Sequence, residues 1–267
     1  MSWIVEKYAE LPRPLRRPLW QWWHRKMNKM DMENIVNFMN YGYESLNGDP
    51  RLKLHDNDEN DRYCIQLYDH VVNQADMKGK HVLEVGSGRG GGAYYIARYY
   101  NPEKYTGLDI SESSIEFCNS HYELENLSFV HGYAEKLPFE DASFDFVVNV
   151  ESARCYADMQ GFFHQVHRVL KPGGKLLIAD MIYPKDVDEF NERIINAGFK
   201  IIKETNISKN VVEALKKDSE RRESLIVEKA PKFLHSSFKT FAGTIGTSRF
   251  NNFANGTFEY WSFILEK

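Results

Sequence analysis

The stretch Glu84–Gly92, with the sequence EVGSGRGGG, constrains the fold more than any other part of the chain. Its five glycines follow the short apolar run His81–Val85, and residues 91–100 beyond it have helical character. A simple strand-to-helix turn needs only one glycine. Several glycines let the chain bend tightly and let a ligand approach the backbone, where free N–H groups and the helix dipole face it. The loop therefore predicts a ligand site between a strand and a helix.

Strands and helices alternate on both sides of this loop. A helix is predicted over 62–77, before the first strand, and Ser111 is a suitable N-cap for the helix after the second strand. The predicted strands are residues 81–85, 105–109, 127–130, 144–150, 175–179, 199–205 and 256–266. Further helices are predicted over 159–170, 187–197 and 209–228. This alternation predicts an α/β fold with a doubly wound, mostly parallel, seven-stranded Rossmann-like sheet.

Three regions follow from this organisation. We expect residues 1–78 to form an N-terminal lid and helices, and 79–182 to form the ligand-binding core. Residues 183–267 are expected to complete the sheet and to carry a helical cap before the last strand. The cap would contain the charged helix 209–228 and an irregular stretch, 231–255. Such an insertion is expected to cover an active site, because functional residues gather on segments held by a rigid sheet.

Composition excludes several classes of protein. A formal net charge of −4 argues against nucleic acid as the main partner, because phosphate binding depends on a basic surface. The three cysteines form no C-x-x-C pair, and no third ligand accompanies His164 and His167, so we predict no metal site. The sequence has no run of eighteen apolar residues and no signal-peptide pattern, which predicts a cytoplasmic protein. Its oligomeric state is left undetermined.

The first thirty residues interleave tryptophans with basic residues. Trp20, Trp22 and Trp23 lie among arginines and lysines, a pattern that a lid helix packed on the core would produce. The same pattern also occurs in helices that lie at a membrane interface. We therefore expect a lid and keep peripheral membrane contact through this N-terminal segment as the alternative.

Two acidic residues indicate the kind of ligand. Asp109 ends the second predicted strand roughly twenty residues after the loop, where a carboxylate accepts hydrogen bonds from ribose hydroxyls. A nicotinamide dinucleotide would fit this feature too. However, Glu84 lies inside the glycine motif, where its charge would repel a pyrophosphate but would suit an ammonium and a sulfonium. No second glycine motif follows the fourth strand either. Both observations favour a cationic sulfur ligand over a dinucleotide.

Further motifs carry a resemblance to a known family. GYAEKLPF (132–139), FDFVV (144–148) and RVLKPGGKLLIAD (168–180) follow the glycine loop. Together they resemble the class I S-adenosylmethionine (SAM)-dependent methyltransferases of the ubiquinone/menaquinone and sterol methyltransferase kind, over Lys80–Asp180. Upstream, NYGY (40–43) resembles the N-x-G-Y/W element that closes over SAM in small-molecule members. The whole chain is similar to the phthiotriol/phenolphthiotriol dimycocerosate O-methyltransferases, which share the glycine run and segments like VESARCY (150–156) and FAGTIGTSRF (241–250).

The resemblance implies S-adenosyl-L-methionine as the cofactor. It implies that the loop glycines pack against the methionine part, that Asp109 holds the ribose and that Ile110 and Ala134 contact the adenine. Tyr43 would reach the methionine carboxylate or cover the sulfonium. Related enzymes commonly have Asp where this chain has Tyr133, whose hydroxyl alone could accept from the adenine amino group. The residues assigned to the cofactor are Tyr43, Glu84, Gly86, Gly88, Gly90, Asp109, Ile110, Tyr133, Ala134 and Asn149.

The end of the fourth strand is the expected place for catalysis. We predict Glu151 as the base or the group that orients the acceptor; the alternative is a structural hydrogen bond in the following turn. Resembling members tend to carry His at the position of Arg154, and arginine cannot act as a base.

Aromatic residues are concentrated in the predicted lid and cap, which predicts an apolar pocket for a small-molecule or lipid-like acceptor. They are Trp20, Trp22, Trp23, Phe38, Phe233, Phe238, Phe241, Phe250 and Phe253. We therefore predict methyl transfer to a hydroxyl of a lipid, polyketide or terpenoid-like molecule. C- or N-methylation of a small metabolite, or a non-catalytic SAM-binding role, remain the alternatives.

Overall fold

The computed structural model describes residues 36–267. The predicted N-terminal lid helix, its tryptophans and the predicted membrane contact lie outside these residues. Within 36–267, no helix combines the length and the apolar character that crossing a bilayer requires.

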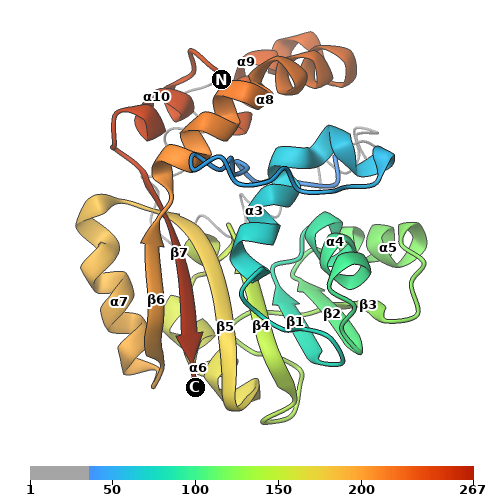
Figure 1. The fold of residues 1–267 in the computed structure, drawn as a ribbon, viewed down its shortest axis with the longest axis vertical. Coiled ribbons are helices and arrows are strands. Elements are labelled where there is room, and N and C mark those ends of the chain that lie inside the picture. Colours follow the sequence, from blue (N-terminus) through green and yellow to red (C-terminus); the bar gives the residue numbers. More distant parts are fainter. Residues whose placement is uncertain (1–35) are drawn as a thin grey trace.

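A single seven-stranded sheet forms the centre of the fold (Figure 1). Its strands are β1 (His81–Val85), β2 (Lys104–Asp109), β3 (Leu127–His131), β4 (Phe144–Val150), β5 (Leu170–Ile182), β6 (Lys200–Asn206) and β7 (Glu259–Glu266). They lie in the order β3-β2-β1-β4-β5-β7-β6, and only β7 runs antiparallel to its neighbours. The predicted mostly parallel, Rossmann-like sheet is confirmed.

Helices cover both faces of this sheet. One face packs against α3 (Arg62–Val72), α4 (Gly91–Tyr99) and α5 (Glu112–His121). The other face packs against α6 (Met159–Val169) and α7 (Val187–Asn196). Val82 and Leu83 are both fully buried, one in each of the two cores, because neighbouring residues of a strand point to opposite faces. The central strands β1 and β4 are therefore mostly apolar and buried, whereas the edge strand β6 (KIIKETN) is largely exposed.

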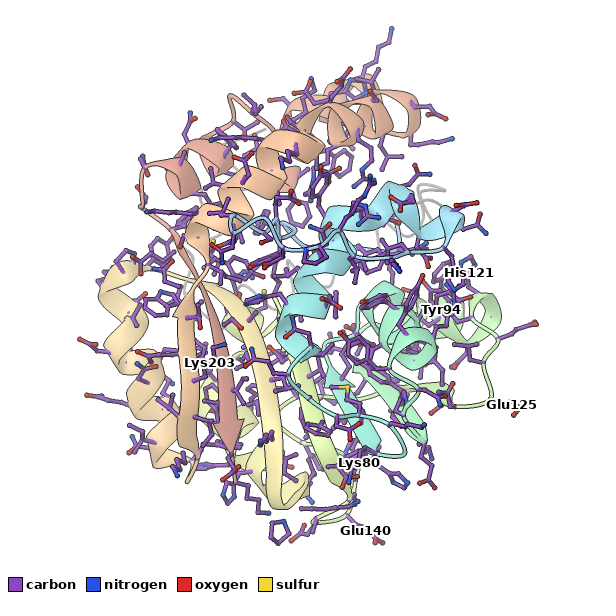
Figure 2. All side chains as sticks on the ribbon, viewed as in Figure 1. Lys80, Tyr94, His121, Glu125, Glu140 and Lys203 are labelled. Atoms are coloured by element: carbon purple, nitrogen blue, oxygen red, sulfur yellow. The ribbon has the colours of Figure 1, made fainter. Side chains whose placement is uncertain are left out.

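The cap lies between β6 and β7 in the sequence, as predicted. It contains α8 (Ser208–Lys229), α9 (His235–Ala242) and α10 (Ser248–Ala254). Figure 1 shows these helices beyond one end of the sheet, with the chain from residue 36 onward running between cap and sheet. In Figure 2, Lys80 and Glu140 mark the opposite end of the sheet.

Some predicted boundaries differ from those observed. Helix α3, predicted over 62–77, ends at Val72, and residues 73–80 form turns and irregular backbone. The stretch 231–255, predicted to be irregular, contains α9 and α10. These helices have eight and seven residues, too few for a clear apolar period, and α10 depends on a cap in which the Thr247 side chain accepts from the Phe250 N–H. Strand β5 begins at Leu170, five residues before the predicted start, at a register irregularity against β4.

Residues 36–44, here called the strap, are attached to the cap by a buried arginine. Arg222 of α8 donates to the carbonyl of Asn40 at 3.1 Å and to that of Ala242 at 3.0 Å. Its charge is balanced by Asp218, which accepts from Nε of Arg222 at 2.7 Å and is 2% exposed. A buried arginine with these partners holds the strap in a fixed position against the cap.

The last glycines of the loop are required by protein packing. A Cβ on Gly92 would lie 2.0 Å from the ring of Tyr68, and one on Gly91 would lie 2.5 Å from the carbonyl oxygen of Asn37. A Cβ on Gly90 would meet the Phe129 ring at 2.8 Å. Contrary to the prediction from the sequence, the number of glycines does not by itself indicate a ligand. Four of the five make room for neighbouring side chains and the strap, because a Cβ on Gly86 would also lie 2.3 Å from Oγ of Ser152.

We expect Gly92→Ala to destabilise the fold by about 1–3 kcal/mol, because the added methyl group overpacks against Tyr68. Urea unfolding measures the loss. In a Tyr68→Ala background, the same substitution is expected to cost much less, because the clashing ring is gone. An equal cost in both backgrounds would contradict this packing.

Candidate active site

A cavity of about 530 Å³ opens at the carboxyl ends of the central strands, beneath the strap. Its wall combines the glycine loop, the residues that follow β2 and β4, the strap residues 37–40, and Phe241 of α9. Seven predicted site residues line it: Gly86, Gly88, Asp109, Ile110, Tyr133, Ala134 and Glu151. Parallel strands bring these residues together, because their carboxyl ends meet at one edge of the sheet.

Asp109 is held rigidly at the end of β2. One carboxylate oxygen accepts from the Gly88 N–H at 2.9 Å, and the other accepts from the Ser111 N–H at 2.8 Å. Each oxygen keeps a second acceptor site, so the carboxylate can still receive two hydroxyl protons. This geometry suits the ribose role predicted for Asp109.

Asp109→Ala is expected to weaken SAM binding by about 1–3 kcal/mol, because hydrogen bonds to a charged acceptor are lost. Isothermal titration with SAM measures the change, and thermal unfolding without ligand checks that the Gly88 and Ser111 backbone remains folded. Unchanged affinity would mean that the ribose binds elsewhere.

Glu84 does not line the cavity. It is fully buried, and its carboxylate accepts from the hydroxyls of Tyr68 at 2.8 Å and Tyr105 at 3.0 Å. Burial raises the pKa of Glu84 to about 7, and the two hydroxyls counteract this only in part. The direct contacts of Glu84 are therefore with the protein and not with a ligand. Its charge at neutral pH is partial, whereas the prediction from the sequence was a fully charged carboxylate.

Three other predicted cofactor residues also lie outside the wall. Gly90 packs under Phe129, and the ring of Tyr43 stacks on His70 with centroids 4.3 Å apart. Asn149 is fully buried behind the loop, where its amide donates to the Val85 carbonyl at 2.8 Å. Strap residues 37–40 occupy the cavity wall where Tyr43 was expected.

Two unpaired polar atoms support a polar ligand in this cavity. The hydroxyl oxygen of Ser87 and the side-chain oxygen of Asn37 are buried in its wall, and neither has a hydrogen-bond partner in the described part of the chain. Buried polar atoms without partners are costly, so a ligand that supplies hydrogen bonds is favoured there. Sequence reasoning missed both, although the position of Ser87 between Gly86 and Gly88 was a usable signal.

The polar wall and its neighbours fit SAM. Asp109 would hold the ribose hydroxyls, Ile110 and Ala134 would flank the adenine, and Ser87 would meet a polar group of the methionine part. Within residues 36–267, no three His, Cys, Asp or Glu side chains converge to hold a metal ion.

Glu151 lies at the other side of the cavity, directly after β4. Its backbone adopts φ +55°, a left-handed conformation that is costly for residues other than glycine and is found at functional sites. One carboxylate oxygen, Oε1, accepts from the Tyr41 N–H and from the Tyr260 hydroxyl, both at 2.8 Å. The other, Oε2, lies 3.6 Å from Nη2 of Arg154. Burial raises the pKa of Glu151.

The aromatic residues predicted to surround the acceptor are distributed differently. Only Phe38 and Phe241 among those in the described residues line the cavity. Phe238 is buried within the cap, while Phe250 and Phe253 belong to the main core. Phe233 is 68% exposed. Phe238 therefore stabilises the cap's own small core, whereas Phe250 and Phe253 attach α10 to the main core.

Comparison with known proteins shows which family the chain resembles. Residues 83–178 match the family described as Methyltransferase domain. A probable phthiotriol/phenolphthiotriol dimycocerosates methyltransferase 2 of Mycobacterium ulcerans is 37% identical over 234 residues, which are 86% of this chain and 89% of the relative. A fatty-acid O-methyltransferase of Mycolicibacterium smegmatis is 41% identical over 76% of this chain and 73% of its own.

Two solved structures share the fold. One is a putative sarcosine dimethylglycine methyltransferase from Galdieria sulphuraria (TM-score 0.71, 14% identity, 90% of this chain and 96% of that chain). The other is a Haemonchus contortus phosphoethanolamine N-methyltransferase 2 in complex with SAM (TM-score 0.67, 21% identity, 75% and 52%).

The fold and the relatives together define an S-adenosyl-L-methionine-dependent methyltransferase. Within that class, the chain belongs to the family that includes the phthiotriol/phenolphthiotriol dimycocerosates methyltransferases and the fatty-acid O-methyltransferase.

Proposed function

We propose that this enzyme methylates a hydroxyl oxygen of a lipid-like molecule. The observation that carries the proposal is Glu151, a buried carboxylate in the cavity wall with one oxygen available to an acceptor. The names of its relatives, one acting on phthiotriol-type lipids and one on fatty acids, support an apolar acceptor. Phe38 and Phe241 supply apolar surface in the wall of the same cavity.

SAM supplies a methyl group bound to a positively charged sulfur. The acceptor oxygen would bond to this carbon as the sulfur–carbon bond breaks, which would leave S-adenosylhomocysteine, and Glu151 would receive the hydroxyl proton. A positioned base contributes about 10²–10⁴-fold, while alignment of the reacting atoms contributes about 7–11 kcal/mol. The strap and Phe241 cover the cavity and would exclude water during the transfer.

A carboxylate acceptor is the nearest alternative, because Arg154 also lines the cavity. Such an acceptor is already ionised and needs no base. However, Arg154 is bound to the carboxylate of Asp180 and faces Glu151, so its charge is balanced by the protein. A further anion in this position would meet two carboxylates, which favours the neutral hydroxyl.

Three acceptors with chains of equal length separate the possibilities. We would incubate the purified protein with methyl-labelled SAM and a long-chain alcohol, a fatty acid or an amine, and identify the extracted products by mass spectrometry. We expect the methyl ether of the alcohol, and a lower rate with a short water-soluble alcohol. A methyl ester or methylamine as the main product, or no labelled product, would contradict the proposal.

A further inference from the structure

We propose that Tyr260 is a positioning residue, which binds one oxygen of the Glu151 carboxylate so that the other faces the acceptor. This inference rests on the proposed function, because it assigns Glu151 as the base. Tyr260 lies on β7, is fully buried and does not line the cavity. It would therefore act only through Glu151.

The two oxygens of Glu151 have unequal surroundings. Oε1 accepts two hydrogen bonds from uncharged donors, the backbone N–H of Tyr41 and the hydroxyl of Tyr260. Within residues 36–267, Oε2 accepts no hydrogen bond, and its ion-pair partner, the guanidinium of Arg154, lies at 3.6 Å, which is too long for one. A carboxylate oxygen has two acceptor sites, so Oε1 is filled by the protein and Oε2 retains capacity for a substrate proton.

The charged neighbours of Glu151 are themselves fixed. Asp180 of β5 is 1% exposed; it accepts from the Arg154 N–H at 3.0 Å and is paired with the Arg154 guanidinium. Arg154 thus pairs through Nη1 with Asp180, while Nη2 faces Oε2 of Glu151. Arg154 and Asp180 therefore set the electrostatic field around Glu151, while the two neutral donors set the orientation of its carboxylate.

The two neutral donors come from different parts of the fold. Tyr260 is held by its strand, where it pairs with Met181 of β5. Tyr41 belongs to the strap, which Arg222 of the cap holds at the adjacent Asn40. The orientation of Glu151 thus depends both on the rigid sheet and on the strap that covers the cavity.

The variant Tyr260→Phe removes one donor and leaves the ring in place. We expect kcat to fall about tenfold or more, because the carboxylate is less well oriented without this donor. The Tyr260 hydroxyl also stabilises the ionised carboxylate in the wild type, so its removal raises the pKa of Glu151. We expect the acidic limb of the kcat/KM profile to move by about one unit to higher pH. SAM affinity should remain unchanged, because Tyr260 is outside the cavity wall.

Tyr95→Phe is the matched control. Its hydroxyl also donates to a carboxylate, that of Asp69, at 2.8 Å, and it is also buried, but it lies away from the cavity. This variant should keep the wild-type pH profile. An unshifted acidic limb in Tyr260→Phe, or an equal shift in the control, would overturn the positioning role. If Glu151→Gln retained full turnover, the proposed base itself would be wrong, which is a separate outcome.

Discussion

Glu151→Gln is expected to lower kcat about 10²- to 10⁴-fold while SAM affinity changes little, because the amide cannot accept the proton released by the hydroxyl. Glutamine keeps the shape of the side chain and can still accept from Tyr41 and Tyr260. Burial raises the pKa of Glu151, and the ionised carboxylate is the active form. Wild-type activity should therefore rise with pH through that raised pKa. Single-turnover measurements across pH test both statements.

Glu135→Gln is a suitable control for this substitution. Glu135 also lines the cavity, but its carboxylate accepts from the Ala157 N–H at 3.2 Å and lies one residue after Ala134, on the predicted adenine side. It should retain most of its turnover. If both variants were equally active, or equally inactive, Glu151 would not be the specific base.

Glu84→Gln is expected to remove a pH dependence of stability worth about 3 kcal/mol. The pKa of Glu84 is raised to about 7 in the fold from an ordinary value near 4.5. The folded state therefore favours the protonated form. Stability from this group is fully present below about pH 4.5 and is lost as the pH rises to about 7.

Urea unfolding of both proteins between pH 5 and pH 8, a range chosen to span the raised pKa, measures this effect. The stability of wild type relative to Glu84→Gln should fall as the pH rises to about 7 and should then remain constant. A difference that does not change with pH would mean that Glu84 is ionised throughout, as the sequence argument first assumed.

The sequence predicted those parts of the site that depend on local pattern. Asp109 is the last residue of β2 and Gly88 lies in the loop that follows β1, and the parallel sheet brings both strand ends to one edge. The same reasoning located Glu151 after β4. These residues could be found because strand ends are marked by a change from apolar residues to glycine or acid.

Residues that reach the site from distant segments were not predictable in this way. Tyr68 of α3 lines the cavity because Gly92 leaves room for its ring, and the sequence does not state that pairing. Glu84 was predicted to lie in the site because it belongs to the loop motif. However, alternate residues of a strand point to opposite faces, and the side chain of Glu84 points toward Tyr68 and Tyr105. Phe38 and Phe241 were predicted to border the pocket and do line the cavity, but which of the predicted aromatic residues would reach it depends on how the cap packs.

The most direct test of the account is a crystal structure of the enzyme with S-adenosylhomocysteine and a long-chain alcohol. We expect the ribose at Asp109 and the alcohol oxygen within about 3.2 Å of Oε2 of Glu151, the reach of a general base. An alcohol oxygen bound away from Glu151, with its chain outside the space between Phe38 and Phe241, would contradict the account.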